Sequence, residues 1–177
     1  LATLALHTYR DDPCSCFKIS YRTDQSDVRN MELDRLMHKA ITVIQFKLEG
    51  EIIRRRPEFE MDDRMLLHHI DLKRGVVHID GKDYTLKDTN WPTLDPKDPY
   101  RLSIEEEDLI RKILHSFESS EKMKKHMRCF FRHGGMYQVC NSNLLFHASI
   151  PMNPDGTFKS VRILGQDYKG RALLDRV

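Results

Sequence analysis

Among the nine histidines of the chain, His147 has the sequence surroundings most typical of a metal ligand. It follows the apolar run 144–146, and two small residues come directly after it. A run that is apolar at every position is typical of a buried central strand, and the end of such a strand lies at the rim of the sheet. An imidazole nitrogen at that rim can bind a divalent metal. The same pattern also fits a histidine that fills the core, so the residues alone leave both interpretations open.

The other reactive side chains form no catalytic motif. The chain has no H-E-x-x-H, G-x-S-x-G, P-loop or G-x-G-x-x-G pattern. His68 and His69 are neighbours on an expected helix and therefore should not face the same way. The acidic clusters 62–63 and 105–107 are typical of helix starts, where they complement the helix dipole. Catalytic residues are therefore left unassigned, and three further histidines are interpreted as surface or core residues: His38, His115 and His126.

The charge balance gives no reason to expect a nucleic-acid partner. Lys and Arg number 29 and Asp and Glu 27, so the net charge is +2, whereas nucleic-acid binders usually carry a clustered basic face. The basic run 54–56 is flanked by acidic residues and is interpreted as a solvated helix end. No apolar stretch reaches the roughly 18 residues that indicate a transmembrane helix, so no membrane partner is expected.

The cysteines indicate a reducing compartment. Cys14, Cys16, Cys129 and Cys140 form no C-x-x-C pair, and the first two are too close for a zinc knuckle. Since no signal peptide is evident, we expect reduced core thiols in a cytoplasmic protein. The chain opens inside an apolar stretch and stops without a tail, so both ends are expected to be cut from something longer.

The first three quarters of the chain predict mainly helices. Residues 27–53 carry apolar residues at helical spacing, with Asp27 as N-cap, Gly50 interrupting the pattern and Pro57 preventing continuation. A short helix is expected over 62–70, and further helices over 103–117 and 119–133 with their apolar residues facing inward. Ser103 and Glu106 form a capping box that starts the first of these. Between the short helix over 62–70 and the helix over 103–117, Asp80-Gly81 predicts a β-hairpin. The proline-rich stretch 88–101 predicts an extended connection pinned by aromatics.

After residue 133 the pattern changes to strands. Residues 136–140 and 144–147 predict two strands, and 158–164 a third after the turn at 154–156. The predicted fold class is therefore α+β. Two regions are expected: a mainly helical region over residues 1–133 and a β-rich segment over residues 134–177.

Several long strings resemble the class III fructose-1,6-bisphosphatases of bacteria. They are residues 38–41, 44–50, 55–59, 61–64, 90–100 and 143–151. That family belongs to the calcineurin-like metallophosphoesterases, which hold two divalent metals, usually Mn²⁺, at the ends of a β-sandwich. The resemblance implies that His147 is a metal ligand, although Ala148 stands where the family usually has Gly. The family's D-x-H, G-D-x-x-D-R-G, G-N-H and G-H-x-H segments are absent from this chain.

The resemblance therefore implies an internal fragment of a longer enzyme. Residues 1–133 would be a helical insertion, and residues 134–177 would belong to an incomplete sandwich. The parent would hydrolyse the 1-phosphate of fructose 1,6-bisphosphate in gluconeogenesis, with Mn²⁺ as cofactor and the sugar bisphosphate as small-molecule partner. This chain alone would be inactive, and a homo-oligomer is compatible with the sequence.

Two other interpretations stay open at this point. The helical region could act as a non-catalytic oligomerisation or regulatory module, with His147 purely structural. Exposed apolar helix faces would favour the enzyme fragment, because they imply that part of the core is missing. A binder of nucleic acid or another acidic partner through residues 54–56 would show binding that falls steeply with salt.

Overall fold

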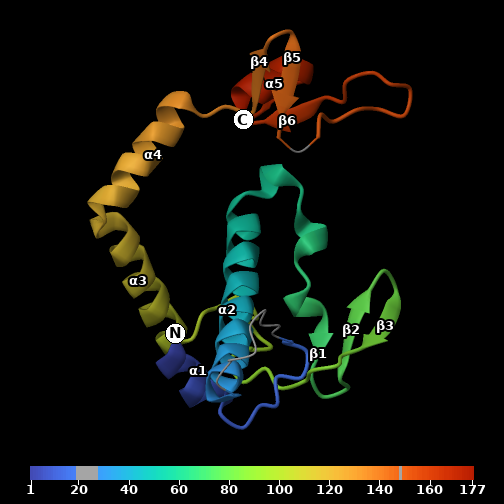
Figure 1. Ribbon diagram of the computed structural model, residues 1–177. Coiled ribbons are helices and arrows are strands. Elements are labelled where there is room, and N and C mark those ends of the chain that lie inside the picture. Colours follow the sequence, from blue (N-terminus) through green and yellow to red (C-terminus); the bar gives the residue numbers. More distant parts are fainter. Residues whose placement is uncertain (19–27, 148) are drawn as a thin grey trace. The chain divides into compact units, whose positions relative to one another are not determined.

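The structure is a computed structural model that describes residues 1–18, 28–147 and 149–177 (Figure 1). It consists of two compact units, Leu1–Leu114 and His115–Val177, which are described separately here. Both helices and small antiparallel sheets are present, so the predicted α+β class is confirmed. The division between the compact units falls inside a helix. The predicted boundary at residue 133 concerns the layout of a parent enzyme and stays a prediction.

A long helix, α2 (Val28–Arg55), is the central element of the first unit, and α1 (Ala2–Tyr9) packs against it. The predicted helix and its end before Pro57 are confirmed, whereas the predicted N-cap, Asp27, lies outside the described residues. The predicted helix includes Gly50, and α2 continues through this position although Gly50 interrupts the apolar pattern. A β-carbon at Gly50 would lie 2.0 Å from Cδ1 of Tyr100. Glycine is present so that the Tyr100 ring can lie against the helix.

Short 3₁₀ turns replace the short helix expected after α2. They span Pro57–Phe59, Asp62–Arg64 and Leu67–His69. The last of these turns ends with His68 and His69, whose ring centroids lie 4.0 Å apart. The expectation that these two rings face apart is therefore wrong.

A three-stranded antiparallel sheet, in the order β1-β2-β3, follows the last turn. Its strands are β1 (Ile70–Asp71), β2 (Val76–Ile79) and β3 (Lys82–Thr85). Asp80 and Gly81 have φ values of 50° and 75°, which is the conformation of a type I′ turn. The predicted hairpin is confirmed.

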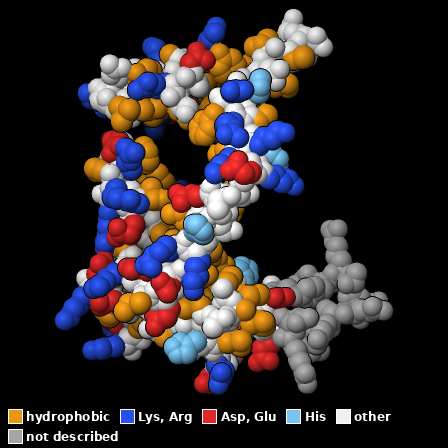
Figure 2. All heavy atoms as spheres, turned by 90° about the vertical axis from the view of Figure 1, so that its left-hand side faces the viewer, with side chains coloured by type: hydrophobic (Ala, Val, Ile, Leu, Met, Phe, Trp, Pro, Cys, Tyr) orange, Lys and Arg blue, Asp and Glu red, His pale blue; other side chains and the backbone are white. Residues whose placement is uncertain are grey.

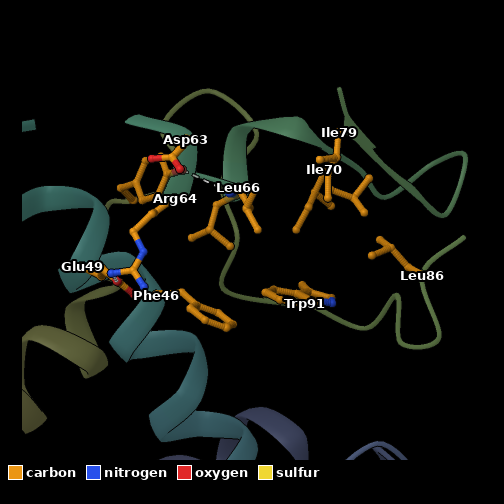
Figure 3. Close-up of a pocket in the computed structure, with 12 residues that line it drawn as sticks. Phe46, Glu49, Asp63, Arg64, Leu66, Ile70, Ile79, Leu86 and Trp91 are labelled. Atoms are coloured by element: carbon orange, nitrogen blue, oxygen red, sulfur yellow. Dashed lines mark hydrogen bonds and ion pairs between the residues drawn. The ribbon is translucent and has the colours of Figure 1, made fainter. Parts of the chain in front are cut away.

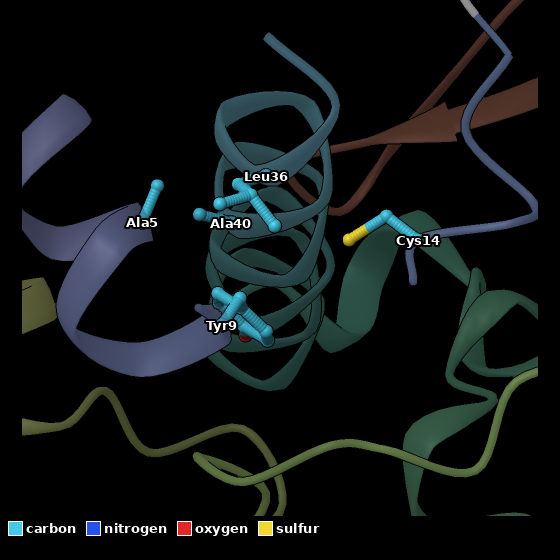
Figure 4. Close-up of a cluster of buried hydrophobic side chains, with 5 residues drawn as sticks. All are labelled: Ala5, Tyr9, Cys14, Leu36 and Ala40. Atoms are coloured by element: carbon cyan, nitrogen blue, oxygen red, sulfur yellow. The ribbon is translucent and has the colours of Figure 1, made fainter. Parts of the chain in front are cut away.

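Two small hydrophobic clusters form the core of the first unit. One joins α1 to α2 through Ala5, Tyr9, Leu36 and Ala40, with Cys14 from the loop after α1 (Figure 4). The second gathers around Tyr100 and brings the end of α2 together with the 3₁₀ turns and the connection 88–101. The described part of that connection has no helix or strand, and its Trp91 Nε1 donates to the carbonyl of Asp88 at 2.9 Å. The predicted pinning by aromatics is confirmed, but the connection is a series of turns rather than extended, with the amides of Leu94, Asp98 and Arg101 each donating to the carbonyl three residues earlier.

Two lysines of α2 are buried in ion pairs that tie loops to the helix. Lys39 is 1% exposed and pairs with Asp12 and, at 2.7 Å, with Asp88. Lys47 pairs with Glu106 at the start of α3 (Ile104–Ser119). The predicted capping box is confirmed, since the Ser103 amide donates to Glu106 at 2.7 Å and the Glu106 amide donates to the Ser103 hydroxyl at 3.2 Å.

The second unit is built from helix α4, two separate hairpins and a short terminal helix. The amide of Met123 donates to the Ser120 hydroxyl at 3.2 Å, which confirms Ser120 as the start of α4 (Glu121–His133). Strands β4 (Tyr137–Cys140) and β5 (Asn143–Phe146) pair antiparallel around a turn at Asn141 and Ser142. The third predicted strand corresponds to β6 (Val161–Ile163), which is shorter than expected. It pairs antiparallel with β7 (Gln166–Tyr168) to form a second hairpin. Helix α5 (Gly170–Arg176) follows.

Much apolar surface in the second unit is uncovered within the described residues, contrary to the sequence-based expectation. Phe130 and Phe131 of α4 are 69% and 84% exposed rather than inward, and β5, expected to be buried, is exposed along its length. Three of the four cysteines are exposed as free thiols, and Cys14 alone is buried. The periodicity identified the apolar faces correctly, but no described segment of this chain covers them.

Candidate functional site

His147 lies directly after β5, at the open end of the β4-β5 hairpin. Its backbone amide donates to the carbonyl of Met136 at 3.3 Å, which extends the hairpin by one residue pair. Tyr137 pairs with Phe146, so Met136 stands opposite His147. The predicted position of His147 at the end of a strand is confirmed, whereas its role as a metal ligand stays a prediction.

A groove of about 590 Å³ runs along this end of the hairpin. Side chains on one face of a hairpin alternate with those on the other. By the observed register, His147, Leu145 and Gln138 therefore lie on one face. The groove is lined by residues of the end of α4, the following glycines and both strands: His133, Gly134, Gly135, Met136, Tyr137, Gln138, Leu145, Phe146 and His147.

This groove holds two imidazoles, from His133 and His147, and no carboxylate. Among the described residues, no group of three or more His, Cys, Asp or Glu side chains could hold a metal ion. A two-metal phosphatase site needs several ligands, usually including carboxylates. The chain therefore fits such a site only in part, with His147 able to supply one nitrogen. Ala148, where the family usually has Gly, lies outside the described residues.

The remaining sequence candidates lie elsewhere and do not converge on His147. Arg54 pairs with Glu51 and Asp98, both at 2.9 Å, and its guanidinium lies over the Tyr100 ring. Arg56 pairs with Glu58 at 3.2 Å, so the basic run at the end of α2 lies beside acidic partners, as the sequence predicts for Glu51 and Glu58. Nδ1 of His78 is 2.9 Å from Asp83 in the β2-β3 hairpin. None of these residues lines the groove.

His68 shares a cluster with Tyr100 in the first unit. Burial lowers the pKa of His68, and the neighbouring His69 and Arg54 add to this effect. Its Nδ1 is 3.0 Å from the Tyr100 hydroxyl, which also accepts from the Leu67 amide at 3.1 Å. This network fixes the 3₁₀ turn against α2 and is explained by packing alone.

A second cavity, of about 480 Å³, lies between α2 and the sheet of the first unit (Figure 3). Phe46 and Trp91 extend into it from one side, and Leu66 and Ile70 face them. Its walls are mostly apolar, with an ion pair between Arg64 and Glu49 at 3.9 Å. Such walls offer little to a phosphate group. The cavity is therefore not the candidate site.

Sequence reasoning missed two features. One is the proximity of His133 to His147: His133 ends α4, Gly134 and Gly135 join it to the hairpin, and both histidines line one groove. The usable signal was a double glycine between a helix and a hairpin. The burial of Lys39 and Lys47 had no sequence signal, because lysines at these positions look like solvated helix residues.

The comparisons with known proteins point to one family. The family model for Firmicute fructose-1,6-bisphosphatase matches residues 1–177. Three of the similar curated proteins are named fructose-1,6-bisphosphatase class 3: those of Parabacteroides distasonis (86% identical), Bacteroides fragilis (58%) and Clostridioides difficile (49%). Each match covers the whole chain but 27% of the relative. No solved structure matches. Among the described residues, no helix is both long and apolar enough to cross a membrane.

Proposed function

Because this chain belongs to the Firmicute fructose-1,6-bisphosphatase family, we propose that it is part of a metal-dependent enzyme that hydrolyses the 1-phosphate of fructose 1,6-bisphosphate. The observation that carries the proposal is the 86% identity, over the whole chain, to a protein named fructose-1,6-bisphosphatase class 3. The chain spans about 27% of the length of the curated relatives that it matches. The activity is therefore proposed for the whole protein, with gluconeogenesis as its setting.

The uncovered surfaces of the second unit support a fragment over an independent module. Val139, Leu144 and Leu145 of the hairpin are 64%, 49% and 55% exposed. Large contiguous apolar surfaces in a soluble protein normally lie against another part of the molecule. A sandwich completed by the rest of the enzyme would cover the hairpin, and the helical residues 1–133 would then be an insertion in that enzyme.

In this proposal His147 supplies one imidazole nitrogen to a divalent metal, with Mn²⁺ as the expected ion. Its place after β5 suits that role, because a strand end holds a side chain more rigidly than a free loop. The other ring nitrogen would be oriented by a neighbouring acceptor, as is usual for metal-bound histidines. The bound metal would supply Lewis-acid chemistry, and His147 would hold it together with ligands that the described residues do not provide.

The test is phosphate release from fructose 1,6-bisphosphate by the full-length enzyme, measured with added Mn²⁺ and after chelation. His147→Ala should lower the Mn²⁺-dependent rate by at least about 100-fold, and bound manganese should fall in parallel. His115→Ala, at an exposed position of α3, is the matched control and should leave both unchanged. Full activity and full metal content in His147→Ala would overturn the ligand assignment.

A further inference from the structure

Helix α4 carries a strong positive charge that the proposed function does not explain. Its 13 residues, EKMKKHMRCFFRH, include five Lys or Arg and a single acidic residue, Glu121. Of these five basic residues, Lys124 forms an ion pair with a described residue, namely Glu121 at 2.8 Å. The remaining charges of the helix are therefore not neutralised by the described part of the chain.

The basic residues of α4 form a stripe that leads to its C-terminal end. Residues three and four apart share a helix face, so Lys125, Arg128 and Arg132 lie along one line, and all three are exposed. Figure 2, turned so that the left-hand side of Figure 1 faces the viewer, shows several Lys and Arg side chains close together on this face, among others spread over the rest of it. We name Lys125, Arg128 and Arg132 the α4 basic stripe.

The stripe ends beside the groove that contains His147. Arg132 directly precedes His133, the last residue of α4, and His133 lines the groove together with His147. The groove volume of about 590 Å³ falls within the range of small-molecule sites, roughly 300–1,000 Å³. The α4 basic stripe thus ends one residue before His133, at the end of the helix that leads to this groove.

A sugar bisphosphate suits this arrangement by charge. Each phosphate carries about −1.5 to −2 charge at neutral pH. Arginine guanidinium groups bind phosphate oxygens in a bidentate manner, and a positively charged surface beside a site raises the rate at which anions reach it. One phosphate could lie at His147 while the other is held by the groups at the end of α4.

We propose that the α4 basic stripe, with His133, is the subsite for the phosphate that is not hydrolysed, and that it draws the bisphosphate towards His147. This proposal rests on the proposed function, because it takes His147 as the reacting end of the groove. It assigns Arg128, Arg132 and His133 to substrate binding rather than to the chemical step.

The experiment uses the full-length enzyme with Arg128→Gln and Arg132→Gln combined. The KM for fructose 1,6-bisphosphate should rise about tenfold with kcat changed less than twofold, and kcat/KM should depend less on ionic strength. The variant Arg128→Lys/Arg132→Lys keeps the charge and should restore most of that salt dependence. Lys159→Gln/Lys169→Gln removes the same charge from exposed positions outside the stripe and should behave as the unmodified enzyme.

A binding measurement separates this inference from the proposed function. Equilibrium binding of fructose 1,6-bisphosphate to metal-free full-length protein should weaken about tenfold in Arg128→Gln/Arg132→Gln and stay unchanged in the control. Normal turnover and binding in that variant would overturn the subsite while leaving the phosphatase intact. Absence of any turnover by the unmodified enzyme with Mn²⁺ would instead overturn the proposed function. Binding to anionic phosphatidylserine vesicles that depends on the two arginines, with sugar bisphosphate binding unaffected, would assign the stripe to lipid and contradict the proposal.

Discussion

The ammonium nitrogen of Lys47 lies 2.7 Å from Oε2 of Glu106, and the two side chains are 0% and 2% exposed. Thr93 completes the arrangement, since its carbonyl accepts from Lys47 at 2.6 Å and its hydroxyl donates to Glu106 at 2.7 Å. The pair therefore joins the middle of α2 to the connection before α3 and to the start of α3. A buried charge left without its partner is costly, so this contact supports specific predictions.

Lys47→Met should destabilise the first unit by about 3–5 kcal/mol, because it leaves the Glu106 carboxylate buried without its cation. Lys47→Met/Glu106→Leu, which removes both charges, should cost much less than the sum of the two single changes. Trp91 is the one tryptophan of the chain, so urea unfolding followed by its fluorescence reports on this unit. Additive effects of the two changes would show that the pair contributes no coupling.

Gly50→Ala should destabilise the chain even though alanine favours helix by about 1 kcal/mol over glycine. The new β-carbon would lie 2.0 Å from the Tyr100 ring, which would have to move away from α2. Overpacking of this kind costs about 1–3 kcal/mol. In a Tyr100→Ala background the same change should become neutral or stabilising. The measurement is again urea unfolding, and an equal loss in both backgrounds would contradict the contact.

Acid should weaken the attachment of the loop after α1 through Asp12. Burial alone would raise the pKa of Asp12, but hydrogen bonds from Lys39, the Cys14 amide and Asn90 outweigh it and lower the pKa. A depressed carboxyl pKa contributes stability above the unfolded value, about 3.9, and loses it as pH falls through the folded value. Asp12→Asn should be less stable at pH 7, and below about pH 4 its difference from the unmodified chain should shrink. A difference in unfolding free energy that stays constant with pH would show that the charge of the Asp12 carboxylate does not stabilise the fold.

The four cysteines should differ sharply in reactivity. Burial, with the nearby Asp12 charge, raises the pKa of Cys14 to about 12, and this thiol is 1% exposed. Because the thiolate is the reactive form, Cys14 should resist alkylation at pH 8 in the folded chain. The exposed cysteines, Cys16, Cys129 and Cys140, should react within minutes. Mass spectrometry of tryptic peptides checks this, with urea-unfolded chain as control. Labelling of Cys14 as fast as the others would contradict the packing of α1 on α2.

Local signals predicted the elements whose causes are local. Asp80-Gly81 forms its turn, the Ser103 and Glu106 side chains cap α3, and Pro57 ends α2 because each acts on residues within a few positions. The reason for Gly50 had no local signal, since the glycine makes room for Tyr100, fifty residues later in the chain. The burial of Lys47 depends likewise on Glu106, which joins it only in the folded unit.

The site could be predicted only in part, for a related reason. The sequence placed His147 after a strand, and the structure agrees. The expected burial of that strand is absent, because no described segment of this chain covers the hairpin. That His133 shares the groove with His147 depends on the path of the chain through Gly134-Gly135, which no helical pattern encodes.

The most direct measurement compares phosphate release from fructose 1,6-bisphosphate by the isolated 177-residue chain and by the full-length enzyme, each with and without Mn²⁺. The account predicts Mn²⁺-dependent turnover by the full-length enzyme and none by the chain alone, since the described residues contain no group of three metal ligands. Clear Mn²⁺-dependent turnover by the isolated chain would contradict it, because a complete site would then have to be assembled from residues within these 177 positions.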